Sequence, residues 1–141
     1  MSRIETILLA SDASPASEAA EDQAIELAAR LASRLVVISV VGGAPSVRAA
    51  RQLSVESIVQ RARAAGAEAT GLCWEGDAGE TIVDAAEAES ADLIVVGTHE
   101  RGAVGRLFLG SVSDHVVRHA CCPVMVVRPA RIPAQASTPG A

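Results

Sequence analysis

The chain has 141 residues, half of them apolar, and a formal net charge of −5. The length suits one domain with a sizeable core, and the charge excludes a general nucleic-acid binder, which needs a basic face to displace counterions. Trp74 and Phe108 are the only Phe, Trp or Tyr residues, so the core is expected to consist of Val, Ile, Leu and Ala.

All twelve basic residues are arginines. The lack of lysine excludes a Walker A loop, a two-component receiver domain and Schiff-base enzymes, each of which uses one. The cysteines, Cys73, Cys121 and Cys122, are odd in number and form no CxxC pair, as is typical of a reducing compartment. The N-terminal apolar run is too short for a signal peptide, and no run approaches the roughly 20 residues of a membrane helix. We therefore expect a cytoplasmic protein that does not enter the membrane.

In the first half of the chain, apolar runs at residues 4–10 and 35–41 predict two strands, the second covered on both faces. Ser14 and Pro15 predict the start of the helix between them, with serine as N-cap and proline at the first helical position. A second helix ends at Gly66. The inner faces expected of these helices are Ala16, Ala20, Ala24, Leu27 and Leu31, and Val55, Ile58, Val59, Ala62 and Ala65.

In the second half, residues 67–74 predict a weaker strand, and Ile82, Val83 and Ala86 mark a third helix. Residues 92–97 (DLIVVG) form a strong buried strand, followed by a glycine-rich loop and a helix at 111–119. The last strand is 124–127 (VMVV). We expect residues 1–129 to form one domain and residues 130–141, rich in Pro, Ala and Ser, to be disordered.

This alternation predicts a doubly wound α/β domain: a five-stranded parallel sheet of order 3-2-1-4-5, with right-handed crossovers and helices on both faces. Ligands of such sheets bind beyond the carboxyl ends of the strands, where the strand order reverses. Here the reversal lies between the first and fourth strands, which end near Ser11-Asp12 and Gly97-Thr98.

The loop after the fourth strand has the features of a phosphate-binding loop. Gly97, Gly102, Gly105 and Gly110 allow the backbone to approach an anion, and a helix begins at Ser111. Ser111 can contact the ligand, or it can form a capping box with the acidic residue three positions on, and both roles can hold together.

Asp12, at the end of the first strand, also has two readings. It can cap the turn that follows, or it can accept hydrogen bonds from ribose hydroxyls or an adenine amine.

Other chemistry has less support. His115 and His119, spaced i, i+4 with Cys121 and Cys122 close behind, could hold zinc. A histidine near a helix C-terminus is also favoured by the helix dipole, so we assign no metal. Cys122 is read as a small packed thiol, with a reactive thiol as the alternative. Without a G-x-S-x-G elbow, no dedicated enzyme is predicted.

The segments ILLASDASPASEAA, DLIVVGTHE and LFLGSVSDHVVRHACCPVMVV resemble the universal stress protein family nearly end to end. The nucleotide-binding branch carries G-x2-G-x9-G-[S/T], which Gly97 and Gly110-Ser111 match at the right spacing. The resemblance implies a site for ATP or another adenine nucleotide, with Mg²⁺ as a candidate companion. The site would be lined by Ala10, Ser11, Asp12, Val40, Gly97, Thr98, His99, Gly110, Ser111 and Val112.

The sequence departs from the family pattern at two positions. Glu100 replaces the second glycine of the motif, and Ala10 stands where the family often has proline. Glu100 adds negative charge where phosphates would pass, and Arg101 and Arg106 could offset part of it.

The resemblance also implies a homodimer paired through the last strand, Val124, Met125, Val126 and Val127, an apolar edge that invites pairing. Two functions follow: a nucleotide-binding stress-response protein without dedicated catalysis, or a dimeric interaction module of the same fold that binds no nucleotide. The sequence identifies no downstream protein partner.

Overall fold

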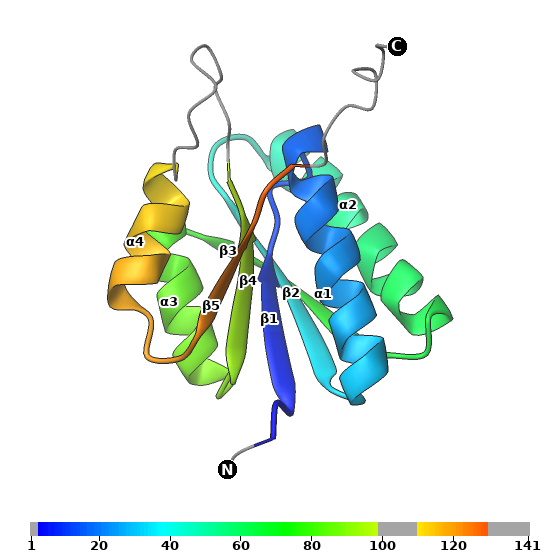
Figure 1. Ribbon diagram of the computed structural model, residues 1–141. Helices are drawn as coiled ribbons and strands as arrows, with labels where there is room; N and C mark the ends of the chain where they lie inside the picture. The colour runs from blue at the N-terminus through cyan, green and yellow to red at the C-terminus, as the bar shows by residue number, and fades with distance from the viewer. Residues whose placement is uncertain (1–2, 99–109, 130–141) are drawn as a thin grey trace, which may run out of the picture.

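A computed structural model describes residues 3–98 and 110–129, which form a three-layer α/β domain (Figure 1). The five strands are parallel and lie in the order β3-β2-β1-β4-β5, which confirms the predicted sheet. The segment 130–141, expected to be disordered, lies outside the described residues. The elements in chain order are β1 (Thr6–Ala10), the 3₁₀ turn η1 (Pro15–Ser17), α1 (Glu18–Leu31), β2 (Arg34–Val41), α2 (Pro45–Ala64), β3 (Glu68–Glu75), α3 (Ala78–Ala88), β4 (Leu93–Gly97), α4 (Ser111–His119) and β5 (Val124–Val127).

The helices cover the two faces of the sheet in pairs, α1 and α2 on one face and α3 and α4 on the other (Figure 1). Side chains alternate between these faces along each strand. On β1, Ile7 and Leu9 pack beneath α1 and α2, whereas Leu8 packs beneath α3 and α4. All three are fully buried, so both faces of the central strand belong to the core.

The predicted inner faces of the first two helices are correct except at their ends. Ala20 and Ala24 are buried in α1, but Leu31, the last residue of the helix before the left-handed Ala32 (φ 56°), is 42% exposed. The buried face of α1 continues instead through Ala28. On α2 the expected stripe is buried up to Ala62, and the next predicted member lies beyond the end of the helix and is exposed.

Gly71 allows α2 to approach β3 closely. A Cβ atom at this position would lie 2.5 Å from Cγ1 of Val55 and 3.3 Å from Cγ2 of Val59. Real Cβ atoms essentially never come within 3.0 Å of such an atom, so a larger residue at Gly71 requires the α2 side chains to move.

The strands separate at the point where the strand order reverses. Pairing of β1 with β4 stops at Leu9–Val95. β1 then continues alongside β2, and the Ser11 amide donates to the Ile38 carbonyl at 3.0 Å. β4 continues alongside β5, where the Thr98 amide donates to the Val127 carbonyl at 3.1 Å. The two central strands therefore diverge and leave an opening between them, at the predicted edge of the sheet.

Two further features complete the fold. β2 and β3 remain paired to their ends, so that Val40 lies beside Trp74. Within residues 3–98 and 110–129, no helix is long and apolar enough to cross a membrane.

Candidate functional site

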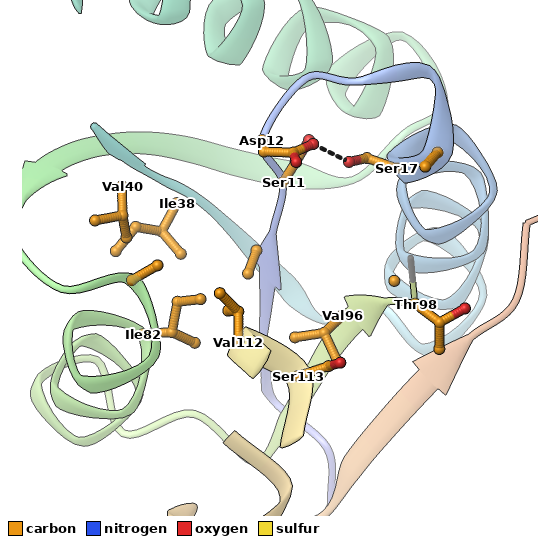
Figure 2. Close-up of a pocket in the computed structure, with 14 residues that line it drawn as sticks. Ser11, Asp12, Ser17, Ile38, Val40, Ile82, Val96, Thr98, Val112 and Ser113 are labelled. Carbon is orange, nitrogen blue, oxygen red and sulfur yellow. Dashed lines mark hydrogen bonds between the residues drawn. The ribbon is translucent and has the colours of Figure 1, made fainter. Parts of the chain in front are cut away.

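A cavity of about 110 Å³ lies in the opening between β1 and β4, with room for several water molecules (Figure 2). Among its lining residues are seven that the sequence predicted for the site: Ala10, Ser11, Asp12, Val40, Gly97, Thr98 and Val112. The fold thus brings together residues that lie more than 100 positions apart in the chain.

One side of the cavity is apolar. Ile38 and Val40 come from β2, Ile82 from α3, Val96 from β4 and Val112 from α4. Figure 2 shows Ile38, Val40, Ile82 and Val112 on the side of the cavity away from α1, with Val96 on β4. Such a surface suits a flat, largely apolar ring, because ligand pockets combine hydrophobic walls with a few polar groups that fix orientation.

The polar side of the cavity is the β1–α1 turn, and Asp12 organises it. Its Oδ1 accepts a hydrogen bond from the Ser17 hydroxyl at 2.6 Å (Figure 2). The same oxygen accepts from the Ser14 amide at 2.9 Å. The turn-capping role considered for Asp12 is therefore present. Ser14 does hold the cap position, but its side chain caps no amide and lies 3.3 Å from Ser17 Oγ instead, at the start of η1.

A buried carboxylate holds Ser11 in place from the side of α1. The Ser11 hydroxyl donates to Glu21 Oε2 at 2.7 Å and accepts from the Ala13 amide at 3.0 Å. Glu21 is only 6% exposed, and its Oε1 lies 3.2 Å from Arg61 Nη1 of α2. A buried carboxylate needs such partners to offset its lost hydration, and these partners tie the turn to both helices.

A second contact fixes Ser11 from the side of β2. The buried Ser39 hydroxyl donates to the Ser11 carbonyl at 2.6 Å and accepts from Arg51 Nη1 at 2.8 Å. Both the side chain and the carbonyl of Ser11 are thus engaged inside the protein. The turn presents Asp12 to the cavity from a fixed backbone.

At the start of α4 the predicted capping box is wrong. Gly110 is the N-cap in extended conformation, so Ser111 is already the first helical residue and its side chain is exposed. Asp114 pairs with Arg118 instead, at 2.9 Å. Ser113 donates its hydroxyl to the Gly110 carbonyl at 3.2 Å and lines the cavity, whereas Gly110 and Ser111 do not line it.

The predicted site residue His99 and the predicted phosphate-loop residues Glu100, Arg101, Gly102, Gly105 and Arg106 lie outside the described residues. The described chain stops just before them at Thr98, which is 1% exposed. Its hydroxyl has no hydrogen-bond partner within residues 3–98 and 110–129.

Sequence reasoning missed half of the cavity lining. The missed residues are Ala16, Ser17, Ile38, Ala78, Ile82, Val96 and Ser113. Ile38 could have been found, because it lies two positions before Val40 and therefore on the same face of β2. The contributions of α3 and of the β1–α1 turn carry no comparable signal, since they depend on how the helices pack.

The histidine and cysteine candidates do not assemble a metal site. No group of three or more His, Cys, Asp or Glu side chains suited to a metal ion exists within the described ranges. His115 and His119 stack with their ring centroids 4.1 Å apart, and Cys121 Sγ lies 3.6 Å from Glu87 Oε2. Burial, and to a smaller extent the charges of Asp92 and Cys121, raise the pKa of the Cys122 thiol. A raised pKa disfavours the nucleophilic thiolate.

Sequence comparison shows the family of the chain, because the profile of the universal stress protein family matches residues 3–128. The chain belongs to the universal stress protein family. A universal stress protein of Thermus aquaticus is 39% identical over 136 residues, which cover 88% of this chain and 98% of the relative.

Solved structures of family members have the same fold. A universal stress protein in complex with cAMP superposes with a TM-score of 0.78 at 29% identity and covers 92% of this chain and all of its own. A family member from Burkholderia pseudomallei has a TM-score of 0.75 at 31% identity and covers 92% of this chain and 99% of its own.

Proposed function

We propose that this universal stress protein binds an adenine nucleotide (ATP, ADP or AMP) in the cavity between β1 and β4 and acts in the stress response through its bound state, without dedicated catalysis. The observation that carries the proposal is the pairing of an apolar slot with a carboxylate at its polar end. Ile38, Ile82 and Val112 supply the slot, and Asp12 lies at its rim. The proposal places the protein in the cytoplasm.

The parts of an adenine nucleotide correspond to the parts of this cavity. The base would occupy the apolar slot, and the Asp12 carboxylate would accept hydrogen bonds from ribose hydroxyls or from the adenine amine. The phosphates would lie toward the start of α4, where backbone amides of the first turn and the helix dipole favour an anion. Mg²⁺, if used, would accompany the triphosphate, because Asp12 is the only carboxylate among the described lining residues.

The cAMP complex of a structural neighbour supports the choice of ligand class, because it places an adenine nucleotide on the same fold at 29% identity. Within residues 3–98 and 110–129, no hydrogen bond joins a serine or cysteine side chain to a histidine ring, so the described residues show no histidine-activated nucleophile. Binding without dedicated catalysis is therefore the proposal.

Glu100 distinguishes this chain from the nucleotide-binding pattern of its family. Two unit charges 4 Å apart repel by about 4 kcal/mol at an effective dielectric constant of 20. We expect a net cost of about 1–2 kcal/mol for a triphosphate, a fraction of this repulsion. ATP should therefore lose more affinity than adenosine.

Calorimetric titration with adenosine, AMP and ATP, with and without Mg²⁺, tests the proposal. Glu100→Gly should tighten ATP about five- to thirty-fold and leave adenosine nearly unchanged. An equal gain for both ligands would point to a changed loop shape rather than to repulsion. Failure of both proteins to bind any of the three ligands would overturn nucleotide binding and leave the interaction module as the function.

The position of β5 supports the dimeric part of the proposal. β5 lies at the edge of the sheet, and Val124, Met125, Val126 and Val127 are all half-buried. An apolar edge strand invites pairing with another chain, and we propose that two copies associate through it. Light scattering at tens of micromolar should give the mass of a dimer, and the mass of a monomer would overturn this assignment.

A further inference from the structure

α3 and α4 approach each other closely at Gly79 and His115. Gly79 is buried in the first turn of α3, and a Cβ atom there would lie 2.8 Å from Cγ and 2.9 Å from both Cβ and Cδ2 of His115. All three distances are shorter than those that real Cβ atoms show. The two helices therefore touch through a position where the side chain is a single hydrogen atom.

The histidine cannot easily move aside to admit a larger residue. One of the three nearest atoms is the His115 Cβ at 2.9 Å, whose position is set by the α4 backbone, so no change of side-chain rotamer would remove that overlap. The ring also stacks on His119, with centroids 4.1 Å apart and planes inclined by 23°. Relief of an overlap at Gly79 would thus require a shift of α4 itself.

The same two helices form one wall of the cavity. Ala78 and Ile82 of α3 and Val112 and Ser113 of α4 line it, and Figure 2 shows Ile82 and Val112 next to each other in the apolar slot. His115 lies about one helical turn beyond Val112. Because helices move nearly as rigid units, the distance between them at the 79–115 contact determines the gap between Ile82 and Val112.

We propose that Gly79 and His115 form a spacer that sets the width of the apolar slot and so determines which ring the slot accepts. Neither residue lines the cavity, so both are positioning residues that act through Ile82 and Val112. The ligand part of this inference rests on the proposed binding of an adenine nucleotide. The assignment also gives a role to a histidine pair whose spacing had suggested a metal.

The test compares Gly79→Ala, His115→Ala and the double variant, with adenosine and 1,N6-ethenoadenosine as probes. The second probe carries an additional fused ring on the base. Gly79→Ala should separate the helices, weaken adenosine about ten-fold and change the ratio of the two affinities at least five-fold in favour of the larger base. The double variant removes two of the three overlapping atoms, Cγ and Cδ2, but keeps the Cβ of position 115. It should therefore recover part of the adenosine affinity lost in Gly79→Ala and move the ratio of the two affinities back toward wild type.

Gly71→Ala is the matched control, because it creates an overlap of the same kind with Val55 on the opposite face of the sheet. It should lower stability and leave the ratio of the two affinities unchanged. If Gly79→Ala also leaves the ratio unchanged, the spacer assignment is wrong. If Gly79→Ala does not fold, His115→Ala must change the ratio, and an unchanged ratio would overturn the assignment as well.

A measurement without ligand separates this inference from the proposed function. Methyl NMR signals of Ile82 and Val112 should shift in Gly79→Ala and return toward wild type in the double variant. If wild type binds neither nucleoside but the methyl signals behave in this way, nucleotide binding fails and the spacer stands. Unchanged methyl signals in a folded Gly79→Ala protein contradict the spacer.

Discussion

The Ser11 hydroxyl donates a 2.7 Å hydrogen bond to Glu21, a carboxylate that α1 holds beneath the β1–α1 turn with 6% of its surface exposed. Glu21 also pairs with Arg61 of α2 at 3.2 Å. The turn that carries Asp12 to the cavity therefore rests on a polar contact that links two helices, rather than on apolar packing alone.

Removal of the Glu21 carboxylate should destabilise the protein. Glu21→Ala leaves the Ser11 hydroxyl without its acceptor and should lower the free energy of unfolding by about 2 kcal/mol. Glu21→Gln keeps an acceptor oxygen and should cost about 1 kcal/mol. Urea denaturation followed by circular dichroism measures both. Glu26→Ala removes an exposed ion pair of the same helix and should stay within about 0.5 kcal/mol of wild type. An equal loss of unfolding free energy in Glu21→Ala and Glu26→Ala would contradict a stabilising role for the buried Glu21 carboxylate.

The structural role of Asp12 should depend on its acceptor oxygen rather than on its charge. Asp12→Asn retains an oxygen for the Ser14 amide and the Ser17 hydroxyl, so the free energy of unfolding should change by less than about 0.5 kcal/mol. Asp12→Ala loses both hydrogen bonds and should cost about 1 kcal/mol. Chemical denaturation of the two variants side by side is the measurement, and a larger loss for asparagine than for alanine would show that the charge matters more.

The glycines at 71 and 97 should respond differently to substitution by alanine. At Gly71 the added Cβ overlaps Val55, and repacking should cost about 1–2 kcal/mol after the gain expected from replacing glycine in a strand. At Gly97 the nearest atoms would be 3.6 Å away, an ordinary contact distance, and stability should be unchanged or slightly improved. Thermal unfolding of both variants checks the order. A less stable Gly97→Ala than Gly71→Ala would contradict it.

Alkylation should distinguish the adjacent thiols. Burial raises the pKa of the Cys122 thiol, so at a given pH a smaller fraction of it is the reactive thiolate than for an ordinary cysteine. Cys121 is exposed and should be labelled first by iodoacetamide at pH 7.5. The labelling rate of Cys122 should continue to rise toward pH 10. Mass spectrometry of timed samples follows both residues, and faster labelling of Cys122 at neutral pH would favour the reactive-thiol alternative.

The sheet was predictable because four of its strands are largely apolar runs bounded by turn residues, as residues 93–97 illustrate, whereas β3 gives a weaker signal. Parallel order and the reversal of strand order then locate the cavity without knowledge of any side-chain position. The predictions that were wrong or incomplete concern the start of α4 and the cavity residues contributed by α3. Ser111 fits a capping pattern, but Gly110 adopts the extended conformation of the cap first. Ala78 and Ile82 reach the cavity because of the way α3 leans on the sheet, which is a matter of packing and leaves no pattern in the sequence.

The pairing of Val40 with Trp74 gives this domain an optical reporter. Trp74 is the single tryptophan of the chain. It lies beside Val40, which lines the cavity, and both side chains pack against the core cluster beneath α3 and α4. With no tyrosine present, emission excited at 295 nm or 280 nm comes from one indole. A shift of its emission maximum during titration would report occupancy of the slot directly, with no label attached and no competing fluorophore.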